Sequence, residues 1–208
     1  DWRVIEYANV PTERIALGGA GVRIGGPEMT WDALEAASTS DAREEPIDLS
    51  LSGIYERGGV AVAEPLAEPD LDTRDFLSVI NRRVADSSSG DVFIFVHGAM
   101  VDFYNACAFT GQMAHFMGRD MVGIAFAWPT EQNIIAYGTG QDVRRAYDSG
   151  EALASFIEFL AARSDARRIH VLSWSAGARV VTESLSTLCR RHPGQTPEEL
   201  RASLRVGT

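Results

Sequence analysis

The 208-residue chain contains no lysine, and all 19 of its basic residues are arginine. This absence excludes a lysine nucleophile and the lysine that contacts phosphate in a P-loop. Acidic residues number 29, and the net charge of −10 disfavours unaided binding to nucleic acid or to an anionic lipid surface. We therefore expect no nucleic-acid partner.

Cysteine and long apolar runs are also scarce. Cys107 and Cys189 fall in separate predicted helices, with neither metal-ligand spacing nor a disulfide framework. No run of about 18 apolar residues exists, so we expect no membrane span in this chain. We also expect no metal and no cofactor. The sequence does not choose between a cytoplasmic and an extracytoplasmic location.

Residues 1–72 are the least regular part and are predicted to be an irregular or β-rich extension. The segment WRVIEYANV (2–10) alternates weakly and is compatible with a strand, and STSDAREEP (38–46) is typical of a solvated loop. LGGAGVRIGG (17–26) matches no phosphate-binding motif, which favours a flexible turn over a nucleotide-binding loop. GGVAVAEP (58–65) is compatible with a short edge strand that ends at Pro65.

Residues 73–208 carry a regular pattern and form the second predicted unit. Apolar runs typical of buried strands alternate with segments of helical spacing, which indicates a parallel sheet with right-handed crossovers. The predicted strands are 91–96, 121–128 and 168–173, and the predicted helices are 73–86, 104–118, 141–163, 176–191 and a short one after a capping box at Thr196. Helical spacing also predicts that Phe116 or Met117, and Tyr147, face the core.

The segment RIHVLSWSAGARVV (168–181) passes from an apolar strand to an apolar helix through Ser-Trp-Ser-Ala-Gly. A nucleophilic serine on such a sharp turn needs small residues two positions before and two positions after it. Ser175 has Ser173 and Gly177 at these positions, whereas Ser173 would have Val171. Ser175 is therefore the candidate nucleophile, and the alternative interpretation is a serine that caps the following helix.

A second motif, FIFVHGAM (93–100), ends the first buried strand with His97-Gly98. An oxyanion hole takes one N–H from the residue after the nucleophile, here Ala176, and one from a loop after an earlier strand. Ala99 or Met100 is the candidate for this second donor. For His97 a buried residue that bonds to loop carbonyls is favoured over a direct role in proton transfer.

With these motifs and FAWPT (126–130), residues 73–208 resemble a bacterial group of α/β-hydrolases of unknown function. In that group we expect strands that end in F-V-H-G-Y-N and S-W-P-S, and an elbow A-H-S-M-G. The resemblance implies an α/β-hydrolase fold, a mainly parallel sheet with helices on both faces, and a serine hydrolase acting on a small-molecule ester. The chain departs from the pattern at Ala99, Met100, Trp174 and Ala176.

These departures concern substrate preference more than the nucleophile. Trp174 is either an apolar wall for an acyl group or a side chain packed under the loop. Trp128 matches the family's W-P and is expected to shape the floor of the site. Asp142 matches an acidic position of the group, but we assign it no catalytic role.

A triad needs a histidine and an acid in addition to Ser175, and in this fold both follow the serine in the chain. His192 is the only later histidine, and the helix between them places it roughly 25 Å away. The resemblance puts the acid after a strand that begins near LRVGT (204–208) and the histidine in a later loop. We therefore expect a fold cut short after the helix that follows the elbow, with the missing C-terminal segment as a partner. The alternatives are a non-catalytic binding or assembly protein and, on weaker grounds, a nucleotide-binding domain.

Overall fold

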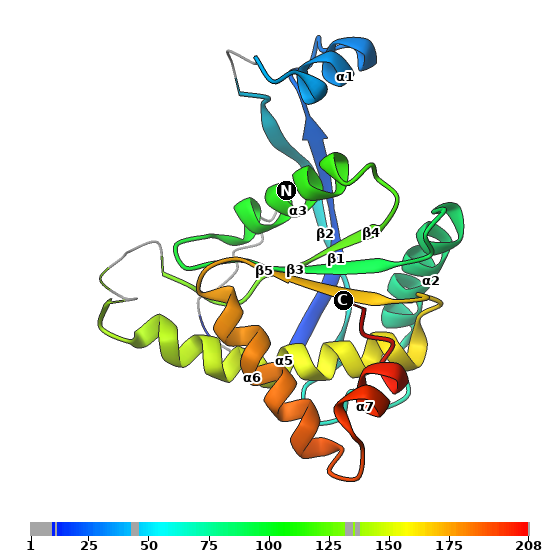
Figure 1. Ribbon diagram of the computed structural model, residues 1–208, viewed down its shortest axis with the longest axis vertical. Helices are drawn as coiled ribbons and strands as arrows, with labels where there is room; N and C mark the ends of the chain where they lie inside the picture. Colours follow the sequence, from blue (N-terminus) through cyan, green and yellow to red (C-terminus); the bar gives the residue numbers. More distant parts are fainter. Residues whose placement is uncertain (1–9, 11, 43–45, 132–134, 136–137, 208) are drawn as a thin grey trace.

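The computed structural model describes residues 10, 12–42, 46–131, 135 and 138–207, and Figure 1 shows their arrangement. Strands and helices are named here in chain order. The elements are β1 (Arg14–Ile24), α1 (Trp31–Thr39), β2 (Leu49–Ala61), α2 (Leu71–Asp86), β3 (Val92–Val96), α3 (Phe103–Phe116), β4 (Val122–Phe126), α5 (Gln141–Arg163), β5 (Ile169–Ser173), α6 (Gly177–Arg191) and α7 (Pro197–Ser203).

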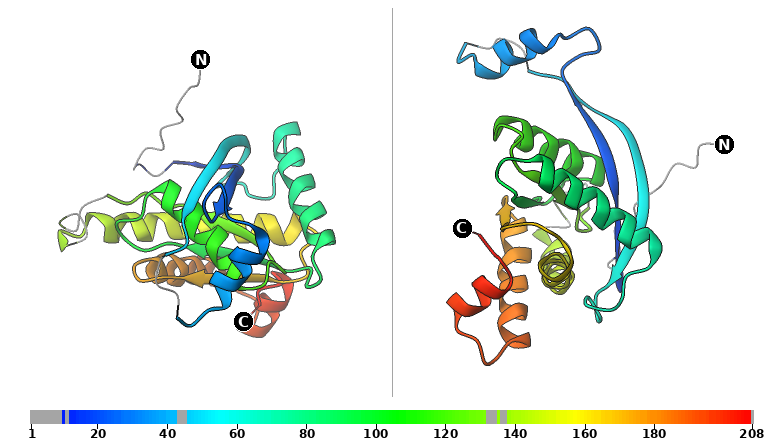
Figure 2. Two further views of the ribbon diagram at one scale, coloured as in Figure 1. Left: turned by 90° about the horizontal axis from the view of Figure 1, so that it is seen from above. Right: turned by 90° about the vertical axis from the view of Figure 1, so that its right-hand side faces the viewer.

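The centre of the molecule is a parallel sheet with the strand order β4-β3-β5. Every residue of the middle strand, Val92–Val96, is buried, as expected for a continuous apolar run with a partner on each side. Helix α3 lies on one side of this sheet, and α5 and α6 lie on the other (Figures 1 and 2). The predicted α/β fold with a parallel sheet is confirmed.

The helix boundaries follow from local capping chemistry. The side chain of Asp70 accepts from the Thr73 N–H at 2.8 Å and begins α2, and Asp102 begins α3 in the same way. The predicted capping box at Thr196 is present, because its hydroxyl accepts from the Glu199 N–H while the Glu199 carboxylate accepts from the Thr196 N–H.

The prediction of which residues face the core differs from the structure in two helices. In α3, Phe116 is 47% exposed whereas Met117, the alternative, is half-buried. The buried residues of this helix are Ala106, Cys107, Ala108 and Thr110. The small side chains let the helix approach β4 closely: a Cβ on Gly123 would lie 3.1 Å from Thr110 Cγ2. Tyr147 is 46% exposed on α5, where the buried face is formed instead by Ala146, Ser149 and Gly150.

The strands are also less covered than their apolar sequences predict. In β4 only Val122 and Phe126 are buried, because this strand has a single neighbour among the described residues. In β5 only Ile169 is buried. Val206 forms an isolated parallel bridge to Ile169, so the segment predicted to begin a further strand does lie beside β5.

The glycine-rich segment 17–26 is not the flexible turn that the sequence favours, because most of it belongs to strand β1. Strands β1 and β2 form a long antiparallel hairpin, separate from the parallel sheet, that packs against α2 and α3 (Figures 1 and 2). Its glycines make room for the partner strand: a Cβ on Gly18 would lie 2.1 Å from the Tyr55 carbonyl oxygen, and one on Gly19 would lie 2.4 Å from the Tyr55 hydroxyl. The segment predicted as a short edge strand after Gly58 is the end of the 13-residue strand β2.

Helix α1, at the far end of this hairpin, was not predicted from the sequence and covers the start of the segment expected to be a solvated loop. Thr30 caps it by accepting from the Ala33 N–H. It contacts the C-terminal end of α3, where Arg119 lies 4.9 Å from the ring centroid of Trp31. The strand expected near residues 2–10 falls outside the described residues except for Val10, and the division at residue 72 stays a prediction.

Candidate active site

The candidate active site lies at the turn between β5 and α6, at the carboxyl edge of the parallel sheet. Trp174 continues the β-ladder through its N–H, which donates to the Val96 carbonyl at 3.1 Å. Ser175 then adopts a φ of 51°, in the left-handed region that side chains other than glycine rarely occupy. Helix α6 begins two residues later at Gly177. This is the strained strand-to-helix turn on which a hydrolase nucleophile stands exposed.

Three other non-glycine residues among those described have a positive φ. Arg119 and Arg205 lie just past the ends of α3 and α7, where a left-handed residue commonly terminates a helix. Met100, with a φ of 61°, does not end a helix and lies in the loop after β3. Ser175 and Met100 therefore share a strained conformation that helix termination does not explain, and both follow strands at the same sheet edge.

Two glycines allow the elbow to fit against the loop after β3. A Cβ on Gly177 would lie 2.3 Å from the Val96 carbonyl oxygen and 2.5 Å from that of His97. A Cβ on Gly98 would lie 3.2 Å from both the Ser175 Cβ and the Trp174 carbonyl oxygen. The structure thus brings together the serine of the elbow and the His-Gly loop, which are 77 positions apart in the sequence.

The backbone N–H groups of Ala176 and Ala99 are the candidate oxyanion donors. Among the described residues, none accepts a hydrogen bond from the Ala176 N–H or from the Ala99 N–H. Ala176 also stands at the N-terminus of the 15-residue helix α6, where the helix dipole favours negative charge. These groups are suited to stabilise an oxyanion that forms on a substrate bound at Ser175.

His97 is buried and supports the loop from within. Its Nδ1 lies 2.8 Å from the Gly98 carbonyl oxygen, and its Nε2 lies 3.1 Å from the Trp128 backbone nitrogen. A carbonyl can only accept and an N–H can only donate, so the neutral ring carries its proton on Nδ1. Burial lowers the pKa of His97 and keeps this neutral form. The Trp128 indole stacks on the ring at 5.4 Å and donates to the His97 carbonyl at 2.7 Å.

The side chains of Trp174 and Met100 are exposed at this sheet edge, at 58% and 44%. Trp174 is therefore not packed under the loop, which was one of its two interpretations. Trp128, in contrast, is only 3% exposed and supports the loop from below. Trp174, which precedes Ser175, and Met100, in the loop after β3, thus expose apolar side chains at this edge.

No histidine serves Ser175 within the part of the chain that the structure describes. The Ser175 hydroxyl has no hydrogen-bond partner there, and His97 is engaged in the loop. The other histidines bond to side chains elsewhere: His115 to Ser38, His170 to Asp91 and His192 to Glu158. A base for Ser175 has to come from outside these contacts.

A buried polar cluster next to the loop contains Thr130, to which the sequence interpretation gave no role, and Asp142, to which it gave no catalytic role. The Thr130 hydroxyl donates to the Val101 carbonyl at 2.8 Å. Asp142 is completely buried, and its Oδ1 accepts from the Glu131 N–H at 3.3 Å and from Arg145 at 3.0 Å. Only the W-P-T sequence near the predicted strand end could have drawn attention to Thr130.

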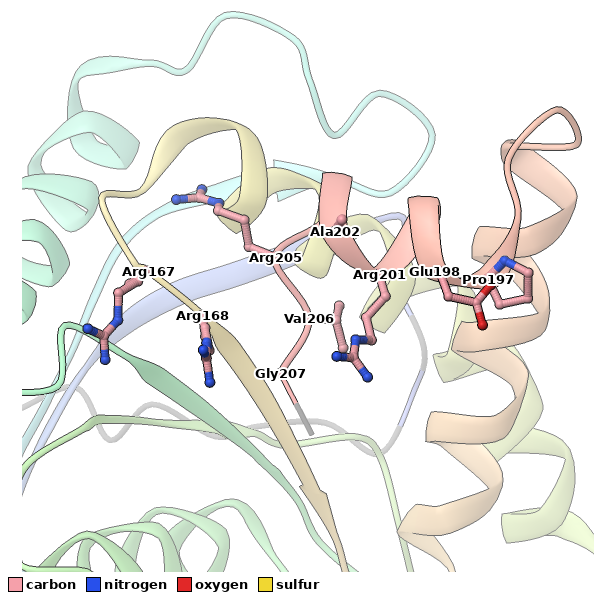
Figure 3. A pocket seen from close by; sticks show the side chains of 9 residues that line it. All are labelled: Arg167, Arg168, Pro197, Glu198, Arg201, Ala202, Arg205, Val206 and Gly207. Atoms are coloured by element: carbon pink, nitrogen blue, oxygen red, sulfur yellow. The ribbon is translucent and has the colours of Figure 1, made fainter.

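A pocket lies away from the elbow, at the amino end of β5 (Figure 3). It has a volume of about 600 Å³ and is lined by four arginines, Arg167, Arg168, Arg201 and Arg205. Arg205 is held by carbonyls at the end of α5, and Arg167 pairs with Asp91 at 3.3 Å. Strand β5 separates this pocket from the elbow by about 16 Å, so it is not part of the candidate active site.

Metal-ligand clusters and membrane-spanning helices are absent from the ranges that the structure describes. Within them, no group of three or more histidine, cysteine, aspartate or glutamate residues could hold a metal ion. No helix in the same ranges is long and apolar enough to cross a membrane.

The sheet, the elbow and the adjoining His-Gly loop define an α/β-hydrolase. Residues 72–203 match the family described as alpha/beta hydrolase of unknown function (DUF900), and the chain belongs to this family. The resemblance inferred from the motifs is thus confirmed at the level of the family. Comparison with curated proteins and with solved structures gives no match. Membership supports a hydrolase activity in general and, with it, a small-molecule substrate.

Proposed function

We propose that this protein is a serine hydrolase that cleaves carboxylic esters through an acyl-enzyme on Ser175. The observation that carries the proposal is the φ of 51° at Ser175, in a turn directly between β5 and α6. A left-handed serine costs free energy, and such strain is typical of functional positions. Here Ser175 is exposed and directly precedes Ala176, and neither the Ala176 N–H nor the Ala99 N–H has an acceptor among the described residues.

In the proposed reaction, the Ser175 Oγ attacks the ester carbonyl carbon while a base removes the hydroxyl proton. The N–H groups of Ala176 and of Ala99 or Met100 stabilise the negative oxygen of the tetrahedral intermediate. The carbon–oxygen bond to the alcohol then breaks, and the alcohol leaves with the proton. Water attacks the acyl-enzyme in the same way, which releases the acid and restores Ser175.

We place the base and its acid, a histidine and an aspartate, in polypeptide that follows residue 208. Two observations support this part of the proposal. Each histidine of the chain is bonded away from Ser175. Val206 also pairs with Ile169 in parallel, as a further strand beside β5 would begin. In this fold the acid and the histidine follow the elbow in chain order.

The substrate preference that we propose is for an ester with an apolar acyl group. The exposed indole of Trp174 is adjacent to the nucleophile, and Met100 adds a second exposed apolar side chain from the oxyanion loop. Contact with an acyl chain would remove this apolar surface from water, which favours binding by about 0.8 kcal/mol per buried methylene.

Labelling of the full-length protein with a fluorophosphonate tests the proposal. We expect covalent modification at Ser175, loss of modification in Ser175→Ala, and full modification in Ser173→Ala as the matched control within the same turn. Peptide mass spectrometry identifies the labelled residue. Absence of both labelling and ester turnover in the intact protein would refute the proposal.

A second function, non-catalytic binding or assembly, is favoured by the absence of a base bonded to Ser175 among the described residues. The exposed Trp174 and Met100 would then contribute to a binding surface. The two functions give opposite outcomes in the labelling experiment, because an isolated serine without a base is a poor nucleophile.

A further inference from the structure

The oxyanion loop is held on both sides of its candidate donors, Ala99 and Met100. On one side, His97 donates to the Gly98 carbonyl at 2.8 Å. On the other side, the Thr130 hydroxyl donates to the Val101 carbonyl at 2.8 Å. Thr130 and Val101 are both buried, at 2% and 7% exposure, so water does not compete for this bond. The loop is thus fixed through two of its own carbonyls.

Fixing a carbonyl also fixes an N–H, because a peptide unit is planar and trans. The Gly98 carbonyl and the Ala99 N–H belong to one such unit and point in opposite directions. The bond from His97 to Gly98 therefore sets the direction of the Ala99 N–H. The bond from Thr130 similarly fixes the peptide unit that follows Val101.

Met100, which lies between these two fixed peptide units, has a φ of 61°. A non-glycine residue keeps this conformation only where its surroundings enforce it. Thr130 supplies a restraint one residue after Met100, on the side of the loop that His97 does not reach. Without it, the segment from Met100 to Val101 could relax and turn the donors away from Ser175.

Thr130 is itself held at both ends of its segment. On its N-terminal side, Trp128 makes two hydrogen bonds to His97 and stacks on its ring. On its C-terminal side, the Glu131 N–H donates to the buried Asp142, and Arg145 bridges Asp142 and the Glu131 carboxylate. The Thr130 hydroxyl is therefore a fixed donor against which the loop is positioned.

We propose that Thr130 is a positioning residue for the oxyanion hole: its bond to the Val101 carbonyl holds Met100 in its left-handed conformation and thereby keeps the Ala99 N–H directed at the substrate oxygen. This inference rests on the proposed esterase function of Ser175. It assigns a role to a residue that does not touch the substrate.

The test compares three variants of the full-length protein with p-nitrophenyl butyrate as substrate. Thr130→Val removes the hydroxyl and keeps the shape, whereas Thr130→Ser keeps the hydroxyl. Thr110→Val is the matched control, because the buried Thr110 hydroxyl also donates to a carbonyl, that of Ala106, at 2.8 Å, but within α3.

For Thr130→Val we expect kcat to fall by about 10- to 100-fold with KM changed by less than about threefold, because misplaced donors act on the transition state. Thr130→Ser should restore kcat to within about threefold of the wild type. Thr110→Val should leave kcat unchanged. Both valine variants should lower Tm by a similar amount, because each loses one buried hydrogen bond. Equal kcat in the two valine variants would overturn the inference.

Two further outcomes are distinguishable. If Thr130→Val does not fold, Thr130→Ala replaces it, and failure of both to fold would overturn the inference in favour of a purely structural role. If the wild type is not labelled at Ser175 and does not hydrolyse the ester, the proposed function itself has failed.

Discussion

Replacement of Gly177 by alanine tests the elbow independently of any substrate. Gly177 is the first residue of α6, where helix propensity alone favours alanine over glycine by up to about 1 kcal/mol. The structure predicts the opposite effect. The new Cβ would lie 2.3 Å and 2.5 Å from the carbonyl oxygens of Val96 and His97, closer than real Cβ atoms approach.

The magnitude follows from the atoms that must move. Both obstructing atoms belong to the backbone at the end of β3, so no flexible side chain can relieve the overlap. Overpacking of this kind costs about 1–3 kcal/mol, and a backbone obstacle favours the upper part of that range. After subtraction of the gain in helix propensity, we expect a net loss of about 1–2 kcal/mol in the free energy of unfolding. A shift of about 1 Å at the elbow should also slow fluorophosphonate labelling of Ser175 by about 100-fold.

Urea unfolding and labelling kinetics measure the two effects, with Gly194→Ala as the matched control. A Cβ on Gly194 meets nothing within 4 Å, so this substitution should leave stability unchanged or slightly raised. Equal free energies of unfolding for the two variants would show that Gly177 is not needed for the close approach of α6 to β3.

Two further predictions concern the acyl group and pH. Trp174→Ala should reduce the kcat/KM ratio of p-nitrophenyl octanoate to p-nitrophenyl acetate, by about fourfold for each methylene that the indole covers; an unchanged ratio would exclude the indole from the acyl site. Because burial lowers the pKa of His97 in the folded state, the unfolded chain binds protons first as pH falls below about 6.5, so the stability contributed by the neutral ring is present above that pH and is lost as pH falls. The His115 pKa is lowered as well and acts in the same direction. Urea unfolding at pH 7 and pH 5 should therefore compare the wild type with His97→Asn, which should lose less free energy of unfolding at the lower pH. Equal losses in the two proteins would contradict the assignment of this effect to His97.

The part of the fold that could be predicted is the part governed by local pattern. Helix α5 begins and ends at the predicted residues, and β3 and α6 deviate by one residue. Apolar periodicity and capping chemistry determine these boundaries, and both can be read within a short window. Ser175 could be distinguished from Ser173 for the same reason, because the size of the neighbours decides which residue can occupy the turn.

The β1–β2 hairpin could not be predicted, because the role of its glycines is to allow close approach of a partner strand that is distant in the sequence. Gly18 and Gly19 lie against Tyr55, which is more than 30 residues away in the sequence. Within a local window, clustered glycines indicate a turn. Helix α3 gave an error of the same origin, since close approach to β4 selects its small residues and leaves Phe116 exposed.

In the candidate site, too, some residues could be recognised from local sequence and others only from the fold. The serine and the His-Gly loop belong to short motifs, whereas the residues that support them come from other elements and are brought there by the fold. Ser175 and Met100 both hold left-handed conformations at the carboxyl edge of one sheet. Each is supported by carbonyl contacts: Gly177 makes room for those of Val96 and His97, and Thr130 binds that of Val101. Strain at Ser175 and Met100 thus persists because the surrounding backbone is fixed. The residues that fix this backbone are the ones that a local sequence pattern does not reveal.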